Sequence, residues 1–203
     1  MQSTGLTQIV ADYIANHRAR ARAELAYFRD LPTDEDAISQ AALGKDAAGR
    51  RHSHQRRLHQ TALKESERRL GGNLQTLQAA GSFDELINLV DSSIRSIFGI
   101  GELAVYDIAL RIGARFGFEP SQVYLHRGTR QGARALGLGA HRLVLDITDL
   151  PAELQTLSPR EAEDALCIYK HQLAQIARGQ APDLGQIHGC TPSRQAPRQG
   201  SAC

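Results

Sequence analysis

A chain of 203 residues with 41% hydrophobic residues can fill the core of a globular domain, and its formal net charge is only +2. This composition excludes collagen-like, disulfide-scaffold and wholly disordered proteins. No run approaches the roughly 18 unbroken apolar residues of a membrane-spanning helix, and the amino terminus lacks the charged start and apolar block of a secretion signal. We therefore expect a soluble, cytoplasmic protein without a membrane partner, and the widely spaced Cys167, Cys190 and Cys203 fit a reducing compartment.

Charge is unevenly distributed along the chain. Residues 50–69 carry seven basic side chains against two carboxylates, and residues 111–142 carry six arginines against one glutamate. Residues 145–164 reverse the sign, with six carboxylates against one arginine. A basic face would attract phosphates, whereas an acidic segment packed beside a basic one would cancel its charge, and the sequence leaves both outcomes open.

Apolar residues recur at helical spacing in the first half of the chain. This spacing predicts three helices, over residues 6–28, 33–44 and 50–80. The third is polar apart from a leucine stripe, and the pair Gly71-Gly72 is expected to interrupt or bend it. Two further helices are expected over 82–97 and 102–116, the first opened by a capping box.

The remaining elements are shorter, except for one. Short helices are expected over 121–125 and 130–136, the second capped by Thr129. The run 142–147 is the only stretch with strand character. The clearest helix covers 158–178, with Ser, Pro and Glu in the positions of an amino-terminal cap. We therefore predict an all-α fold, with a single helical domain over 1–178 that contains a hairpin motif at 86–116, and a disordered tail over 179–203.

Two glycines, Gly99 and Gly101, lie between two of the predicted helices. Glycine weakens a helix interior by roughly 1 kcal/mol, so the pair indicates a tight turn with unusual backbone angles. The segment FGIGELAV, residues 98–105, resembles the helix-hairpin-helix motif, in which Ile100 fills the gap between the two helices.

The resemblance implies nonspecific contact with DNA phosphates through bare amides of the hairpin. Unpaired N–H groups and the helix dipole both favour an anion at the start of a helix. Glu102 departs from the motif, because a carboxylate there stabilises the helix but repels a phosphate. The same hairpin would also serve simply to join two packed helices.

A second candidate for phosphate contact lies downstream. Residues 124–137 concentrate four basic or titratable side chains, His126, Arg127, Arg130 and Arg134. Arginines four apart on a helix share a face and repel unless an anion binds between them, and the planar guanidinium suits phosphate oxygens. Alternatively, these side chains pair with the acidic block or remain solvated. An auxiliary basic contact is expected at Arg50, Arg51, Arg56 and Arg57.

No reaction can be assigned from these residues. Helix-hairpin-helix glycosylases need a catalytic aspartate roughly 20 residues past the hairpin, but residues 120–141 contain no carboxylate. Tyr106 and Asp107 form either a polar site or a packed tyrosine with its hydroxyl satisfied. The histidines at 52–59 lack accompanying cysteines, and the tail offers only part of a zinc site, so we predict neither a metal nor a cofactor.

We therefore expect a nonspecific nucleic-acid-binding module. The alternative is a protein-interaction or homo-oligomerisation domain, in which the hairpin is structural and the helix over 50–80 supplies the contact surface. A third possibility is a small phosphorylated ligand held by His126 and the arginines, which would require a closed pocket.

Overall fold

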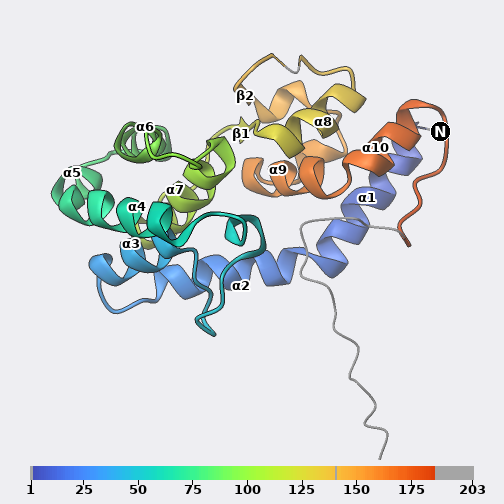
Figure 1. Cartoon of the computed structure of the whole chain (residues 1–203). Coiled ribbons are helices and arrows are strands. Elements are labelled where there is room, and N and C mark those ends of the chain that lie inside the picture. Colours follow the sequence, from blue (N-terminus) through green and yellow to red (C-terminus); the bar gives the residue numbers. More distant parts are fainter. Residues whose placement is uncertain (1, 140, 186–203) are drawn as a thin grey trace, which may run out of the picture.

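The computed structural model describes residues 2–139 and 141–185, and its helices form two groups (Figure 1). The first lobe contains the helices α2 to α7, and the second lobe contains α1, α8, α9, α10 and a small sheet. The all-α prediction is confirmed, because the described residues hold only one sheet of two short strands. The domain boundaries drawn from the sequence stay a prediction.

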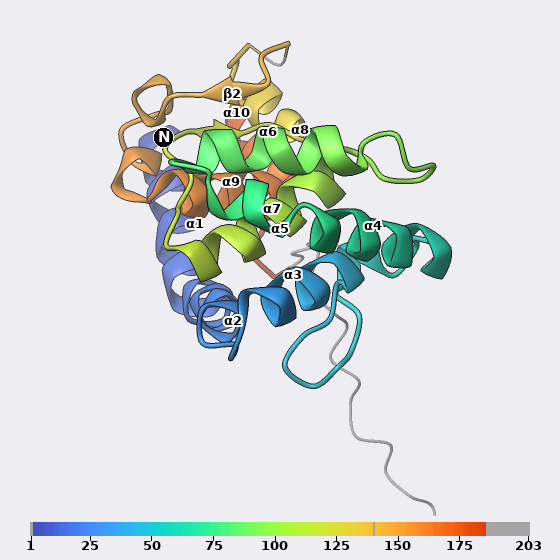
Figure 2. The same cartoon turned by 90° about the vertical axis from the view of Figure 1, so that its left-hand side faces the viewer.

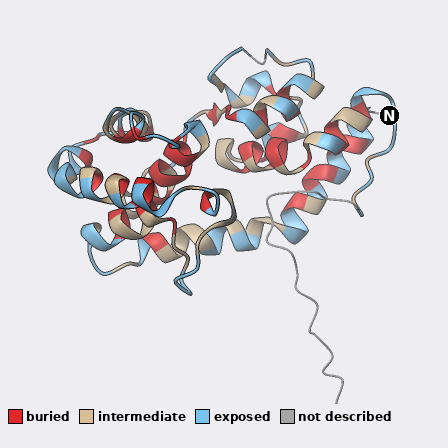
Figure 3. Ribbon diagram, in the orientation of Figure 1, coloured by how far each residue is buried: buried red, intermediate tan, exposed pale blue. Residues whose placement is uncertain are grey.

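The first lobe is built from six helices around one apolar core. They are α2 (Arg18–Arg29), α3 (Asp34–Leu43), α4 (Gln60–Gly72), α5 (Leu74–Gln78), α6 (Phe83–Ile94) and α7 (Glu102–Phe116). Nine of the fifteen residues of α7 are buried, which makes it the central helix of this lobe (Figure 3). Capping signals in the sequence set several of these boundaries, since Thr33 accepts a hydrogen bond from the Asp36 amide and Ser82 accepts one from the Glu85 amide.

The second lobe packs four helices and a two-stranded antiparallel sheet around a separate core. Its elements are α1 (Gln2–Asn16), β1 (Val123–Tyr124), α8 (Arg127–Ala135), β2 (Val144–Leu145), α9 (Pro159–Ile168) and α10 (Lys170–Ala177). At Gly132 of α8, an added Cβ atom would lie 2.2 Å from the carbonyl oxygen of Leu166. The absence of a side chain at Gly132 therefore lets α8 and α9 approach each other closely.

Two predicted helices are each broken once, and the breaks lie against each other. The helix expected over 6–28 breaks at His17, and the one expected over 158–178 breaks at Tyr169. The ring of His17 stacks on Tyr13 at 6.1 Å and meets the edge of Tyr169 at 5.8 Å. Neither break contains glycine or proline, so tertiary packing of the rings accounts for them and local propensity does not.

The prediction of one helix over 50–80 is wrong in its first ten residues. Residues 44–59 form a loop that is pinned by Asp46, whose carboxylate accepts hydrogen bonds from the amides of Ala48 and Arg50. Such a local side-chain bond competes with a helix. The helix starts at Gln60, and its leucine stripe lies inside the first lobe, where Leu63, Leu70 and Leu77 are fully buried. The expected interruption near Gly71-Gly72 is confirmed.

The short helix expected over 121–125 is also wrong. Val123 and Tyr124 form β1, which pairs with β2 in the register Val123 to Leu145 and Tyr124 to Val144. β-Branched valines favour this pairing, and the expected strand over 142–147 is confirmed in β2. The next helix, α8, begins three residues earlier than predicted.

At the carboxyl end, residues 178–185 form neither helix nor strand, and residues 186–203 of the expected disordered tail lie outside the described residues. The partial zinc site of the tail, formed by His188, Cys190 and Cys203, lies within residues 186–203 and so outside the described residues. Within the described ranges, no helix is both long and apolar enough to cross a membrane.

Candidate functional site

The turn between α6 and α7, residues 95–101, projects from the edge of the first lobe (Figure 2). Gly99 has a φ of +93°, a conformation that other residues rarely adopt. Ile100 is 6% exposed and packs into the first core, whereas Phe98 beside it is 94% exposed. The turn is therefore anchored by one apolar side chain while its outer edge faces solvent.

The start of α7 has the backbone features expected of an anion site. Gly101 occupies the N-cap position, and no side chain caps the first amides of the helix. An added Cβ at Gly101 would meet nothing within 4 Å, so the backbone there is open to solvent. The amides of the first turn are thus available to an anion that approaches from outside.

The arginines of α8 lie beside this turn. Arg127, Arg130 and Arg134 have the spacing of one helix face, and Arg130 Nη1 donates to Glu102 Oε2 at 2.7 Å. This hydrogen bond lowers the pKa of the Glu102 carboxyl. Because the bond joins the arginine face to the first turn of α7, the two predicted phosphate contacts form one surface. We call it the hairpin surface: residues 98–101 with Arg127, Arg130 and Arg134.

The acidic block of the sequence does not cancel this surface. Within the described part of the chain, no ion pair involves Arg127 or Arg134, and both are exposed. Five of the six carboxylates of residues 145–164 have other partners. These are Gln122 for Asp146, Arg142 for Asp149, Arg18 and Arg22 for Glu161, His126 for Glu163 and Arg160 for Asp164. Only Arg130 is neutralised, and its partner is the glutamate of the hairpin.

His126 has a different position from the one expected. Its side chain is 4% exposed, its Nδ1 accepts a hydrogen bond from the Gly128 amide, and its Nε2 is hydrogen-bonded to Glu163. His126 therefore caps α8, where the sequence indicated Thr129 as the cap, and Thr129 instead donates to the backbone carbonyl of His126. Its ring faces the interior between the lobes and not the arginine face of α8.

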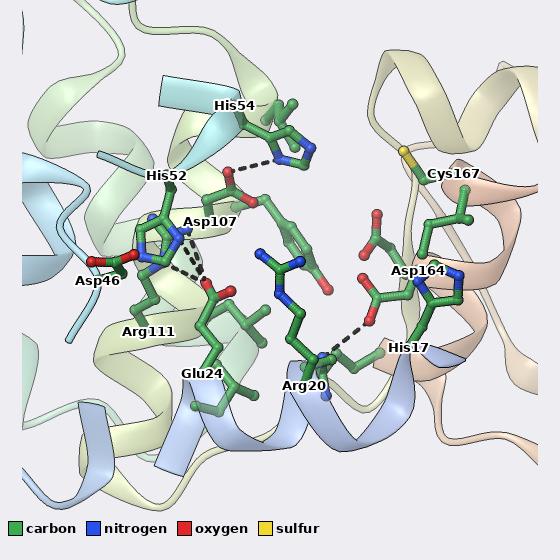
Figure 4. A pocket seen from close by; sticks show the side chains of 18 of the residues that line it. His17, Arg20, Glu24, Asp46, His52, His54, Asp107, Arg111, Asp164 and Cys167 are labelled. Carbon is green, nitrogen blue, oxygen red and sulfur yellow. Dashed lines mark hydrogen bonds and ion pairs between the residues drawn. The ribbon is translucent and has the colours of Figure 1, made fainter. Parts of the chain in front are cut away.

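A polar cleft lies between the two lobes, with a volume of about 230 Å³ (Figure 4). Its walls are α2, the loop over residues 46–56, α7 and α9, with His126 at the start of α8. Three of the four auxiliary basic residues, Arg50, Arg51 and Arg56, line this interlobe cleft, whereas Arg57 is exposed outside it. Cys167 of α9 also lines the cleft and is buried.

Ion pairs in the cleft walls shift the pKa values of the residues that form them. His54 Nδ1 lies 3.3 Å from Asp107 Oδ2. Burial opposes ionisation of Asp107, but His54 and Arg111 outweigh it and lower the pKa of this carboxyl. Burial also opposes a charge on His126, yet the bond to Glu163 raises the pKa of its imidazole.

Asp164 lies at the α9 side of the cleft and accepts hydrogen bonds from Tyr13 at 2.9 Å and Arg160 at 3.0 Å. Burial raises the pKa of Asp164 to about 6, against the opposing effect of Arg160. A carboxyl that titrates near neutrality in a cleft is a common feature of functional sites.

Tyr106 packs as the sequence indicated, but its hydroxyl has no hydrogen-bond partner among the described residues. The ring lies 6.2 Å from His126 and 5.6 Å from Tyr124, and the side chain is 4% exposed. Burial raises the pKa of Tyr106 well above its ordinary value, so the hydroxyl keeps its proton at neutral pH. The expectation that this hydroxyl would be satisfied is wrong.

Sequence reasoning singled out some of the residues that line the cleft, on α7, at the start of α8 and in the loop over residues 46–56, but it did not predict the cleft or the contributions of α2 and α9. The α9 carboxylates appeared only as part of a surface acidic block, and nothing in their local pattern indicated burial opposite Tyr106. Among the described residues, no group of three or more His, Cys, Asp or Glu side chains is arranged to hold a metal ion. No family model, curated protein or solved structure matches this chain.

Proposed function

We propose that this protein binds nucleic acid without reading its sequence, through the hairpin surface. The observation that carries the proposal is the outward α6–α7 turn: Gly99 and Gly101 are exposed, and α7 begins without a side-chain cap. Backbone amides and guanidinium groups contact phosphates in any sequence, so such a surface gives affinity without base readout.

Three further features support the same ligand. Arg127 and Arg134 supply two cations that are not neutralised within the described chain. Phe98, exposed at the tip of the turn, offers a flat face on which an unpaired base could stack. The resemblance to the helix-hairpin-helix motif is part of this proposal.

The alternative hypothesis of an interaction domain needs the leucine stripe of the helix over 50–80 as an exposed contact surface. The leucine stripe that would pair with a partner helix packs inside the first lobe, against α3 and α6. An oligomer would have to use another surface. We also propose a cytoplasmic location, on the grounds of the scattered cysteines.

The test is a fluorescence-anisotropy titration of single-stranded and duplex DNA over a range of salt concentrations. The double variant Arg127→Gln/Arg134→Gln should bind more weakly, and the slope of log affinity against log salt should become shallower by about 2, because two phosphate contacts are lost. The control variant Arg29→Gln/Arg178→Gln removes the same charge from two exposed residues at the ends of α2 and α10 and should have little effect.

Absence of binding at 50 mM salt would reject the proposal. Equal weakening by Arg127→Gln/Arg134→Gln and by Arg29→Gln/Arg178→Gln would show that overall charge, and not this surface, attracts the nucleic acid. Light scattering of the same samples detects any oligomer and thereby tests the rival hypothesis directly.

A further inference from the structure

In the interlobe cleft, the carboxylates are paired with basic side chains, but some arginines are left without a carboxylate partner in the part of the chain that the structure describes. Five carboxylates line it, and each has a basic partner: Arg111 for Glu24 at 3.2 Å, Arg50 for Asp46 at 3.2 Å, His54 for Asp107 at 3.3 Å, His126 for Glu163, and Arg160 for Asp164 at 3.0 Å. The cleft therefore holds no carboxylate that needs a cationic ligand.

Three of the arginines that line the cleft have no such partner. Within residues 2–139 and 141–185, no ion pair involves Arg20, Arg51 or Arg56. Arg51 already donates to the backbone carbonyl of Leu58 and to the side chain of Gln60. Arg20 extends from α2 into the cleft (Figure 4), and Arg56 lies in the loop that forms another wall. The charge that is left over is positive.

The buried wall of the cleft adds an unused hydrogen-bonding group. The Tyr106 hydroxyl lies among Arg160, Glu163 and Asp164, which act on it electrostatically, but it has no hydrogen-bond partner in the described chain. A buried hydroxyl without a partner costs about 1–3 kcal/mol, so its retention needs an explanation, and a ligand in the cleft supplies one.

We propose that the interlobe cleft binds a phosphate monoester, with its phosphate on the guanidinium groups of Arg20 and Arg56 and an oxygen of the ligand at the Tyr106 hydroxyl. A phosphate monoester carries a charge of about −1.5 to −2 at neutral pH, which matches two unpaired guanidiniums better than a single carboxylate does. The phosphate belongs either to a small molecule or to the end of a nucleic-acid strand.

This inference does not depend on nucleic-acid binding by the hairpin surface. The first experiment is a calorimetric titration of the whole chain with inorganic phosphate at constant ionic strength, with chloride as the balancing ion. We expect saturable binding that weakens about tenfold in Arg20→Gln and in Arg56→Gln, because each removes a charge-assisted hydrogen bond.

Tyr106→Phe separates a role in binding from a role in folding. Removing an unpartnered hydroxyl leaves the melting temperature unchanged or raises it, while phosphate binding weakens. The matched control is Arg178→Gln, which removes one exposed arginine outside both the cleft and the hairpin surface and should bind phosphate as the wild type does. Absence of saturable binding, or equal affinity in the cleft variants and the wild type, would overturn the proposal.

Two oligonucleotides of one sequence, with a 5′-phosphate or a 5′-hydroxyl, then identify the source of the phosphate. A preference for the phosphorylated strand that is lost in Arg20→Gln supports the proposal with a strand end as ligand. Inorganic phosphate binding without this preference supports it with a small phosphate ester as ligand.

Discussion

The ion pair between Glu102 and Arg130 gives the sharpest test of the hairpin surface, because the proposal requires that this carboxylate opposes binding. The Glu102 carboxylate neutralises one of three arginines on the surface and also lies in the first turn of α7, where the open amides point. The variant Glu102→Gln removes the negative charge and keeps the size of the side chain. It releases Arg130 for a phosphate and should therefore increase affinity for DNA.

The expected magnitudes follow from the exposure of the pair. The side chains of Arg130 and Glu102 are 24% and 43% exposed, so the pair contributes at most about 1 kcal/mol to folding, and the interaction of the carboxylate with the helix dipole adds about 0.3–1 kcal/mol. The variant should thus stay folded. One added phosphate contact makes the salt slope steeper by about 0.9, so the gain in affinity over the wild type shrinks by about 3.5-fold between 50 and 200 mM salt.

The assay is the same anisotropy titration, with Glu119→Gln as the control. Glu119 is exposed just beyond the other end of α7, so this variant makes the same change in net charge at a distance from the hairpin. If Glu102→Gln binds DNA no more tightly than Glu119→Gln, or shows the wild-type salt slope, the assignment of phosphate contact to the hairpin surface is refuted.

Three further predictions concern stability, each measured by urea unfolding. Gly132→Ala should lower the free energy of unfolding by about 3 kcal/mol, because the new methyl group meets the backbone of α9. The control Gly71→Ala, in open space on α4, should leave the free energy of unfolding unchanged or raise it by up to about 1 kcal/mol. Equal effects would contradict the close packing of α8 on α9. Gly99→Ala should lower the free energy of unfolding by about 1–3 kcal/mol, because alanine rarely adopts a positive φ. Gly99→Asn should lower it less, because asparagine tolerates a positive φ better. An alanine variant as stable as the wild type would mean that Gly99 does not have a positive φ in the turn. Burial raises the pKa of Asp164 to about 6, so this group favours folding most below pH 4 and loses that contribution as the pH rises through 6. The free energy of unfolding of the wild type relative to Asp164→Asn should therefore fall between pH 4 and pH 7. A constant difference would argue against the burial of this carboxyl.

Local signals in the sequence predicted a large part of the helical architecture. Ser158, Pro159 and Glu161 mark the start of α9, and all three occupy the predicted capping positions. Gly117 ends α7 in the left-handed conformation, with a φ of +79°. These features depend on residues within one or two turns of each other, so the chain specifies them without reference to the rest of the fold.

Sequence pattern failed where a side chain had competing partners. Residues 50–59 do not join the helix predicted over 50–80, because the Asp46 carboxylate accepts hydrogen bonds from the Ala48 and Arg50 amides and holds this segment in a loop. His126 replaces Thr129 as the cap of α8 because Glu163, far away in the chain, fixes its ring.

The sequence by itself therefore determined the helical class, most of the helix ends and the glycine turn, since each of these depends on local spacing and backbone freedom. The position of the α8 arginines beside that turn comes from tertiary packing. Only the tertiary structure decided which charges remain unpaired. The partners that neutralise the acidic block, and the cleft that Tyr106 and Asp164 both line, come from segments that are separated along the chain and meet only when the two lobes pack together.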